Sequence, residues 1–159
     1  MSLSAPPPIK QDGAPFAIGL VAARFNSVLV DALLHTVYEE LTAAGVKEKR
    51  ITVLRVPGSH EVPWAARALA SRKGCHAVIG LGVLIAGDTN HHEMVGQSVS
   101  QALQQVALTT GTPVINGVMV VNSLKQAEER CTGAINRGVE FARAALEMAA
   151  LRQTLGGRS

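Results

Sequence analysis

The chain has 159 residues, of which 47% are hydrophobic and 17% are charged, and its net charge is +3. This length suits one compact domain with a substantial core, and the composition excludes an intrinsically disordered chain. Scattered Lys and Arg residues, with only one Trp, one Tyr and three Phe, argue against nucleic-acid binding.

Residues 1–15 are predicted to form a flexible, Pro-rich tail, because the prolines at 6–8 lack the N–H donors of a central strand. This start has neither the charged nor the apolar region of a signal peptide. No apolar run reaches the roughly 20 residues that span a bilayer. We therefore expect a soluble cytoplasmic protein that does not bind membranes.

A strand, a helix and a second strand are predicted in the first third of the chain. The apolar segment 16–23 predicts the first strand. Asn26 or Ser27 can cap the helix that follows, and its apolar residues repeat every four positions until Gly45 ends it. Segment 51–56 predicts the second strand, which a Pro-Gly pair terminates.

The rest of the chain continues to alternate between helix and strand. Its strand patterns are unbroken apolar runs, and its helix patterns repeat about every 3.6 residues. Ser123 and Gln126 have the spacing of a capping box. The predicted elements are helix 62–72, strand 77–85, helix 93–110, strand 114–121 and helix 135–151.

Strands that are apolar on both faces and separated by helices predict a parallel sheet covered on each side. The predicted fold class is α/β, a flavodoxin-like three-layer α/β/α sandwich with a central parallel four-stranded sheet. Ligands of such sheets bind beyond the carboxyl ends of the strands. This rule groups loops 24–26, 57–61, 87–92 and 116–122 along one edge.

Segment 87–93 is the most informative part of the chain. It follows a buried strand and begins a helix, so unpaired N–H groups there can bind a phosphate. The imidazole of His91 lies beside them and can titrate near neutral pH. The alternative is that Asp88, Thr89 and Asn90 only cap the helix, and local geometry leaves both interpretations open.

Metal and dinucleotide sites are not expected. His91, His92 and Glu93 are adjacent, and adjacent side chains diverge rather than converge on one ion. The glycines do not form a GxGxxG motif after the first strand. Cys75 and Cys131 form no CxxC pair, and we interpret them as small buried residues in a reducing compartment.

Five motifs occur in order between about residues 16 and 150: Ala23-Arg-Phe-Asn26, Val56-Pro-Gly-Ser-His-Glu-Val-Pro63, Gly82-Val-Leu-Ile-Ala-Gly-Asp-Thr-Asn-His91, Gln126-Ala-Glu-Glu-Arg130 and Ala145-Leu-Glu-Met-Ala149. In sequence and spacing they resemble the 6,7-dimethyl-8-ribityllumazine synthase family of riboflavin biosynthesis. The resemblance covers most of the chain and rests on several motifs in register.

The resemblance implies a transferase that condenses 5-amino-6-(D-ribitylamino)uracil with 3,4-dihydroxy-2-butanone 4-phosphate and releases water and inorganic phosphate. It implies no cofactor, since an amine and a ketone form a Schiff base given proximity and proton transfer. It also implies a homo-oligomer with active sites shared between subunits. A homopentamer is the minimum, and a decamer or a sixty-subunit shell remains open.

Residue roles follow from the resemblance position by position. His91 matches the general acid/base, and Phe25 matches the aromatic residue that stacks on the pyrimidine. The remaining positions for the ribitylaminouracil are Ser59, His60, Glu61, Val83, Leu84, Ile85 and Asn116. The positions for the butanone phosphate are Asp88, Thr89 and Arg130, of which Arg130 is expected to reach the site of an adjacent subunit.

Four features depart from the usual family pattern. Ala86 replaces a frequent basic residue, His92 replaces a common aromatic residue, and Asn116 stands where many members have Phe. Segment 131–138 is shorter than the frequent form with two lysines, and only Arg137 remains as a counterpart. These changes bear on substrate affinity and assembly more than on the reaction type.

The resemblance assigns residues 16–153 to the synthase domain and residues 154–159 to a C-terminal tail. Two other functions remain open: an archaeal-type riboflavin synthase on the same scaffold, and a non-catalytic flavin- or lumazine-binding or shell-forming homologue. The joint presence of His91 and Arg130 favours the enzyme, because a binding protein needs neither proton transfer nor a phosphate clamp.

Overall fold

A computed structural model describes residues 4–156 of the chain. Four strands form one sheet in the order β2-β1-β3-β4, and every neighbouring pair is parallel. The strands are β1 (Ile18–Ala23), β2 (Ile51–Val56), β3 (Ala77–Ile85) and β4 (Val114–Val121). The predicted parallel four-stranded sheet is confirmed.

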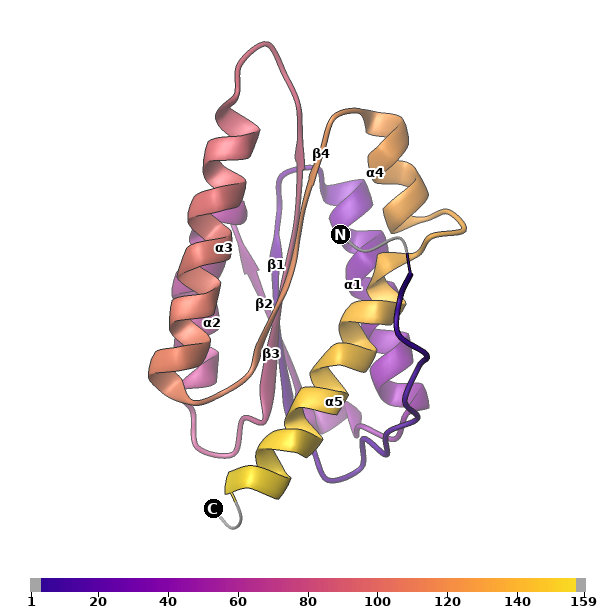
Figure 1. The fold of residues 1–159 in the computed structure, drawn as a ribbon, viewed down its shortest axis with the longest axis vertical. Coiled ribbons are helices and arrows are strands. Elements are labelled where there is room, and N and C mark those ends of the chain that lie inside the picture. Colours follow the sequence, from indigo (N-terminus) through magenta and orange to yellow (C-terminus); the bar gives the residue numbers. More distant parts are fainter. Residues whose placement is uncertain (1–3, 157–159) are drawn as a thin grey trace.

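Helices cover both faces of the sheet (Figure 1). The helices are α1 (Ser27–Ala43), α2 (Val62–Ala70), α3 (His91–Thr110), α4 (Leu124–Cys131) and α5 (Arg137–Gly156), with short 3-10 turns η1 (Glu48–Arg50) and η2 (Ser59–Glu61). Helices α2 and α3 pack on one face, and α1, α4 and α5 on the other. The predicted three-layer α/β/α sandwich is therefore also confirmed.

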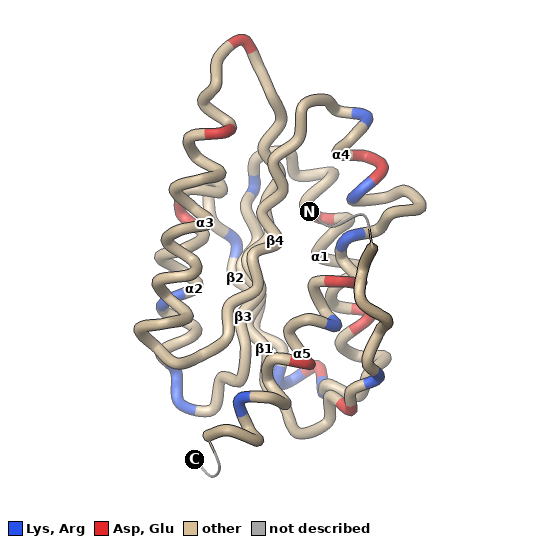
Figure 2. The backbone as a smooth tube through the Cα atoms, in the orientation of Figure 1, with Lys and Arg blue, Asp and Glu red and all other residues tan. Residues whose placement is uncertain are grey.

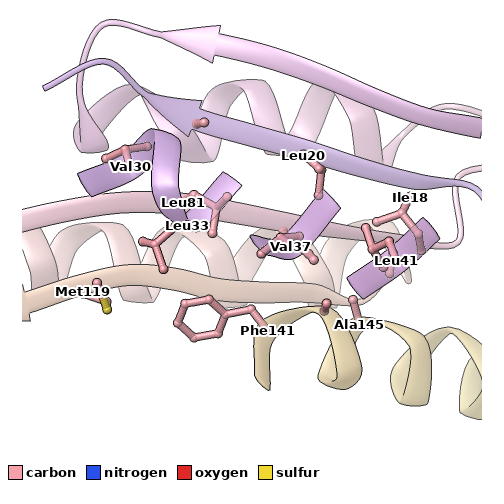
Figure 3. Close-up of a cluster of buried hydrophobic side chains, with 14 of the residues drawn as sticks. Ile18, Leu20, Val30, Leu33, Val37, Leu41, Leu81, Met119, Phe141 and Ala145 are labelled. Atoms are coloured by element: carbon pink, nitrogen blue, oxygen red, sulfur yellow. The ribbon is translucent and has the colours of Figure 1, made fainter. Parts of the chain in front are cut away.

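Strand β3 lies between β1 and β4 and supplies both hydrophobic cores. Ile79, Leu81 and Val83 pack with α1, α4 and α5, in the cluster shown in Figure 3. Val78 and Leu84 point the other way and pack with α2 and α3. This alternation explains why the strand is an unbroken apolar run, since each buried Leu or Val contributes about 1.5–3 kcal/mol over leaving it exposed.

Of the caps proposed for α1 and α4, the one at α4 is confirmed. Ser123 Oγ accepts a hydrogen bond from Gln126 N at 3.2 Å and caps α4. Asn26 precedes α1 but makes no capping bond, because its backbone is left-handed, with φ 54°. Its side-chain amide instead donates to Val83 O at 2.8 Å, and this bond ties the β1–α1 loop to the end of β3.

Two helices extend beyond their predicted limits. Helix α3 begins at His91, before the predicted start at residue 93, and His91 N donates to Thr89 Oγ1 at 3.4 Å. Helix α5 continues to Gly156, past both the predicted helix end at 151 and the domain limit at 153. Arg152 anchors its last turns by donating from Nη1 to Cys75 O at 2.7 Å.

Hydrogen bonds fasten the end of the N-terminal segment to the sandwich. Gly13 N donates to Ala44 O at 2.8 Å, and Arg50 Nη1 donates to Pro15 O at 2.9 Å. Within residues 4–156, every helix is too short or too polar to cross a bilayer.

Candidate active site

A pocket of about 480 Å³ lies beyond the carboxyl ends of β1, β2 and β3. The connections that follow these three strands surround it, as the topology of a parallel sheet dictates. The β3–α3 connection projects well beyond the sheet at this end (Figure 1). The pocket is lined by Phe25, Asn26, Gly58, Ser59, His60, Glu61, Val83, Leu84, Ile85, Gly87, Thr89, His91, His92 and Val95.

The loop after β1 places an aromatic ring at this pocket. Phe25 N donates to Pro57 O at 3.3 Å, so the loops after β1 and β2 are joined through their backbones. The ring of Phe25 lies over Gly58, where an added Cβ would come within 3.2 Å of it. Phe25 is 72% exposed. An exposed ring held by its backbone offers a flat apolar surface on which a heteroaromatic ligand can stack.

The turn η2 after β2 contributes polar groups. Glu61 Oε2 accepts from Gly58 N at 2.9 Å, and Glu61 Oε1 is 3.9 Å from His60 Nδ1. Ser59 is only 4% exposed and packs on Gly82 of β3, where a Cβ would lie 2.4 Å from Ser59 Oγ. The missing side chain at Gly82 therefore lets η2 approach the sheet and brings these polar groups to the pocket.

The start of α3 brings two further groups to the same pocket. His91 and Thr89 are exposed, and both line the pocket. The first N–H groups of a helix lack intrahelical partners and carry partial positive charge, so they favour an anion. The first of these N–H groups, His91 N, donates to Thr89 Oγ1. This bond partly confirms the prediction that residues 88–90 cap the helix. Asp88 lies outside the pocket lining.

Comparison with known proteins agrees with this geometry. The family model for 6,7-dimethyl-8-ribityllumazine synthase matches residues 15–153. A protein of that name from Desulfotalea psychrophila is 43% identical over 92% of this chain and 94% of its own length. Another from Paracidovorax citrulli is 42% identical over 91% of this chain and 92% of its own length. This chain belongs to the 6,7-dimethyl-8-ribityllumazine synthase family.

Among the residues that the family resemblance singled out, most line the one pocket. They are Phe25, Ser59, His60, Glu61, Val83, Leu84, Ile85, Thr89 and His91. The structure therefore gathers residues from three separate loops and one strand end.

Asn116 is not among them. The prediction that loop 116–122 belongs to the rim is wrong for all but Asn122, because Val114–Val121 is strand β4. Asn116 pairs with Gly80 in mid-sheet, whereas the strands end at the pair of Ile85 and Val121. Its side chain accepts from Val118 N at 3.0 Å. Asn116 therefore lies away from the pocket of its own chain.

Arg130 also lies outside the pocket. It is on α4, on the opposite face of the sheet from α3, and its Nη1 donates to Gln126 O at 3.1 Å. No Lys or Arg of residues 4–156 lines the pocket. Figure 2 shows acidic but no basic residues along the β3–α3 connection and the first turn of α3. The pocket of this lumazine synthase family member thus has no Lys or Arg from the described part of its own chain.

Five residues of the pocket lining were not predicted as site residues, namely Asn26, Gly58, Gly87, His92 and Val95, and of these Asn26 and His92 have polar side chains. Asn26 was interpreted as a helix cap, and His92 as a departure from the family pattern. The helical period of α3 could have shown that His92 is buried, because His92 is the first residue of the buried stripe that continues through Gly96 and Val99. No local signal shows that Asn26 bonds Val83, because the two residues are distant in sequence.

The cysteines lie apart from the pocket. Burial raises the pKa of the Cys131 thiol to about 11, and it also raises the pKa of Cys75. Cys131 is buried as predicted, whereas Cys75 is only half-buried. High thiol pKa values fit the interpretation that neither is a nucleophile. Within residues 4–156, no cluster of three or more His, Cys, Asp or Glu has the arrangement of a metal site.

Proposed function

We propose that this protein is a lumazine synthase, a transferase that condenses 5-amino-6-(D-ribitylamino)uracil with 3,4-dihydroxy-2-butanone 4-phosphate. The observation that carries the proposal is the joining of three features in one pocket. These features are an exposed aromatic ring with an apolar strand end, a polar turn, and an imidazole at the start of a helix. Membership of the family supports the same reaction.

The apolar side of the pocket suits the uracil ring. Phe25 offers a face for stacking, and Val83, Leu84 and Ile85 line the pocket at the end of β3. Backbone groups at a strand end can pair with a uracil edge, which has both donors and acceptors. The carboxylate of Glu61 is suited to accept hydrogen bonds from ribityl hydroxyls.

The start of α3 suits the phosphate of the second substrate. N–H groups at a helix start bind phosphate oxygens. At the start of α3, His91 N donates to Thr89 Oγ1 and Glu93 N donates to Asn90 O, and the Thr89 hydroxyl adds a polar group beside them. Asp88 would repel a phosphate, which fits its position outside the pocket lining.

His91 is placed to move protons between the two substrates. The uracil amine attacks the ketone carbon, a C–N bond forms, and the carbonyl oxygen leaves as water once it has been protonated. Loss of a proton from the hydroxyl-bearing carbon then expels the phosphate with its bonding electron pair and leaves an enol, which becomes a ketone. The second amine closes the ring by attacking this ketone carbon, whose oxygen leaves as a second water. Each step transfers a proton, and an exposed imidazole can act as both general acid and general base. No metal or organic cofactor is required for these steps.

A neighbouring subunit completes the proposed site. A phosphate dianion calls for a guanidinium or ammonium group, and the chain's own pocket lining has neither. Arg130 of an adjacent subunit is the proposed partner of the phosphate, and Asn116 of that subunit is the proposed contact to the uracil. This arrangement explains why the two residues lie away from the pocket within one chain.

Exposed apolar residues support association between copies of the chain. Strand β4 is at the sheet edge, and Val120 on it is exposed, as are Leu108 on α3 and Leu155 on α5. Trp64 on α2 and Val28 on α1 are exposed as well. Two different apolar surfaces on one chain fit a head-to-tail ring, and we propose a homopentamer as the smallest assembly.

We further propose that residues 16–153 form the catalytic domain and that the enzyme acts in the cytoplasm. Both cysteines are free thiols, as expected in a reducing compartment.

The direct test is to mix both proposed substrates with the purified protein and to record the absorbance and fluorescence of the lumazine product. We expect lumazine to form faster than in a protein-free mixture, and only when both substrates are present. A rate equal to that of the protein-free mixture would contradict the proposal. Formation of riboflavin from added lumazine would support a riboflavin synthase instead.

A further inference from the structure

The inward-facing side of α3 begins with a histidine. The buried residues of this helix are His92, Gly96, Val99, Leu103 and Val106, and their spacing matches the helical period. All except His92 are glycine or aliphatic, as expected for a stripe that packs on the sheet. His92 therefore places a polar ring at a position where packing alone favours an apolar side chain.

The imidazole of His92 is buried and unsatisfied. The residue is 9% exposed, and within residues 4–156 neither Nδ1 nor Nε2 has a hydrogen-bond partner. A neutral imidazole has one donor and one acceptor, and a buried polar group without a partner costs free energy. The fold alone gives no reason for a histidine here. A partner from outside the chain would provide one.

The surroundings of His92 indicate where that partner binds. His92 lines the candidate active-site pocket together with Leu84 and Val95. Because its two nitrogens are inaccessible, other atoms of the residue face the pocket. A half-turn of the ring about the Cβ–Cγ bond exchanges nitrogen and carbon positions, and so can turn a nitrogen toward a ligand without moving the helix.

We propose that His92 is a positioning residue that hydrogen-bonds the ribitylaminouracil. This inference rests on the proposed function. His91 and His92 are adjacent, so their side chains point about 100° apart around the helix. His91 is exposed beside Thr89, whereas His92 faces the sheet near Leu84, where the uracil ring is proposed to lie.

The chemistry of the two substrates supports the same assignment. A uracil edge presents both N–H donors and C=O acceptors, so it can satisfy either nitrogen of a neutral imidazole. A phosphate dianion presents only acceptors. A phosphate could pair with the imidazole N–H alone, so the donor and the acceptor of His92 together match the uracil better, and the proton transfers are left to His91.

The test compares His92→Phe with His92→Gln. Phe keeps a ring in the buried space, and an aromatic residue is common at this position in the family, so the fold should persist. Gln keeps one donor and one acceptor. His35→Gln is the remote control, because His35 is exposed on α1 and pairs with Glu39 at 3.1 Å.

We expect His92→Phe to raise the KM for ribitylaminouracil about three- to tenfold, the loss of one hydrogen bond. The kcat and the KM for the butanone phosphate should change less than twofold. The dissociation constant for ribitylaminouracil alone, measured by calorimetry, should rise by the same factor. His92→Gln and His35→Gln should remain close to the wild type.

An unchanged KM and dissociation constant in His92→Phe, with an active wild type, would overturn the role of His92 and leave the proposed function standing. An inactive wild type that does not bind the uracil would overturn the proposed function itself. If His92→Phe does not fold, a crystal of the wild type with ribitylaminouracil decides. A ring nitrogen within hydrogen-bond distance of the ligand supports the assignment, and two unpaired nitrogens refute it.

Discussion

At the residue scale, the local environment separates two adjacent histidines. His91 is exposed at the pocket, and His92 is buried at the start of the inward stripe of α3. The difference follows from the helical turn between consecutive residues. Two adjacent residues of the same type therefore have different proposed roles. His91 is the candidate general acid/base, and His92 is the candidate hydrogen-bonding partner of the substrate.

Replacing His91 by Ala should lower kcat by about 100-fold, at the low end of the contribution of a positioned acid–base group. A larger loss is not expected, because holding both substrates together still accelerates their condensation. The measurement is steady-state formation of lumazine, with thermal unfolding and gel filtration to verify the assembly. Full activity in a correctly assembled variant would remove His91 from its proposed role.

His76 should make stability depend on pH. Burial, followed by the charges of Arg50 and Arg152, lowers the pKa of His76 below its usual value of 6.5. The neutral ring accepts a hydrogen bond from Ala17 N at 2.9 Å, and protonation of Nδ1 would remove it.

The unfolded chain binds this proton more readily than the folded chain. The contribution of His76 to the free energy of unfolding should therefore be fully present above about pH 6.5 and decrease as the pH falls below that value. The unfolding temperature of the wild type should therefore decrease more between about pH 7.5 and about pH 5.5 than that of His76→Asn. Equal decreases in both proteins would show that His76 contributes nothing to the pH dependence.

At the scale of elements, the packing of β3 and β4 depends on a close approach between residues of the two strands. Gly117 of β4 is buried, and a Cβ there would lie 2.7 Å from Gly80 O and 2.7 Å from Leu81 Cδ2. The carbonyl belongs to the backbone of the central strand, so it cannot move aside cheaply. The absence of a side chain at Gly117 is therefore required by the packing of the sheet.

Gly117→Ala should destabilise the fold by about 1–3 kcal/mol, the usual cost of overpacking a core. The control is Gly156→Ala at the end of α5, where nothing lies within 4 Å of an added Cβ. Thermal unfolding at equal protein concentrations should show a lower unfolding temperature for Gly117→Ala only. If Gly117→Ala unfolded at the same temperature as Gly156→Ala, the two strands could move apart without a loss of stability.

At the scale of the whole molecule, the pocket has residues for the uracil and the proton steps, but no Lys or Arg from residues 4–156 lines it. Arg130→Ala should raise the KM for the butanone phosphate about ten- to 100-fold, as expected for a lost charge-assisted contact. An unchanged KM would refute the assignment of Arg130 to the phosphate.

Mixed oligomers test whether neighbouring subunits share the site. His91→Ala and Arg130→Ala chains, co-expressed in equal amounts, should form some sites with an intact His91 from one subunit and an intact Arg130 from its neighbour. In a head-to-tail ring, about one quarter of the sites would be complete. Activity well above that of either variant alone supports a shared site. No gain would contradict a site shared between His91 of one subunit and Arg130 of its neighbour.

The sequence by itself determined the order and type of all four strands and four of the five helices, and the family resemblance indicated most of the pocket. Unbroken apolar runs separated by amphipathic helices specify a parallel sheet, and parallel strands bring their carboxyl-end loops together. Phe25, Glu61 and His91 could be assigned to one rim because each directly follows a strand or begins the next helix.

Only the tertiary structure decided the remaining features, because they depend on contacts between distant segments. Asn26 reaches Val83, and the register of β4 moves Asn116 away from the rim. Burial without a partner distinguishes His92 from His91. A local pattern encodes the conformation of its own segment, but which groups meet across the fold depends on strand register and packing.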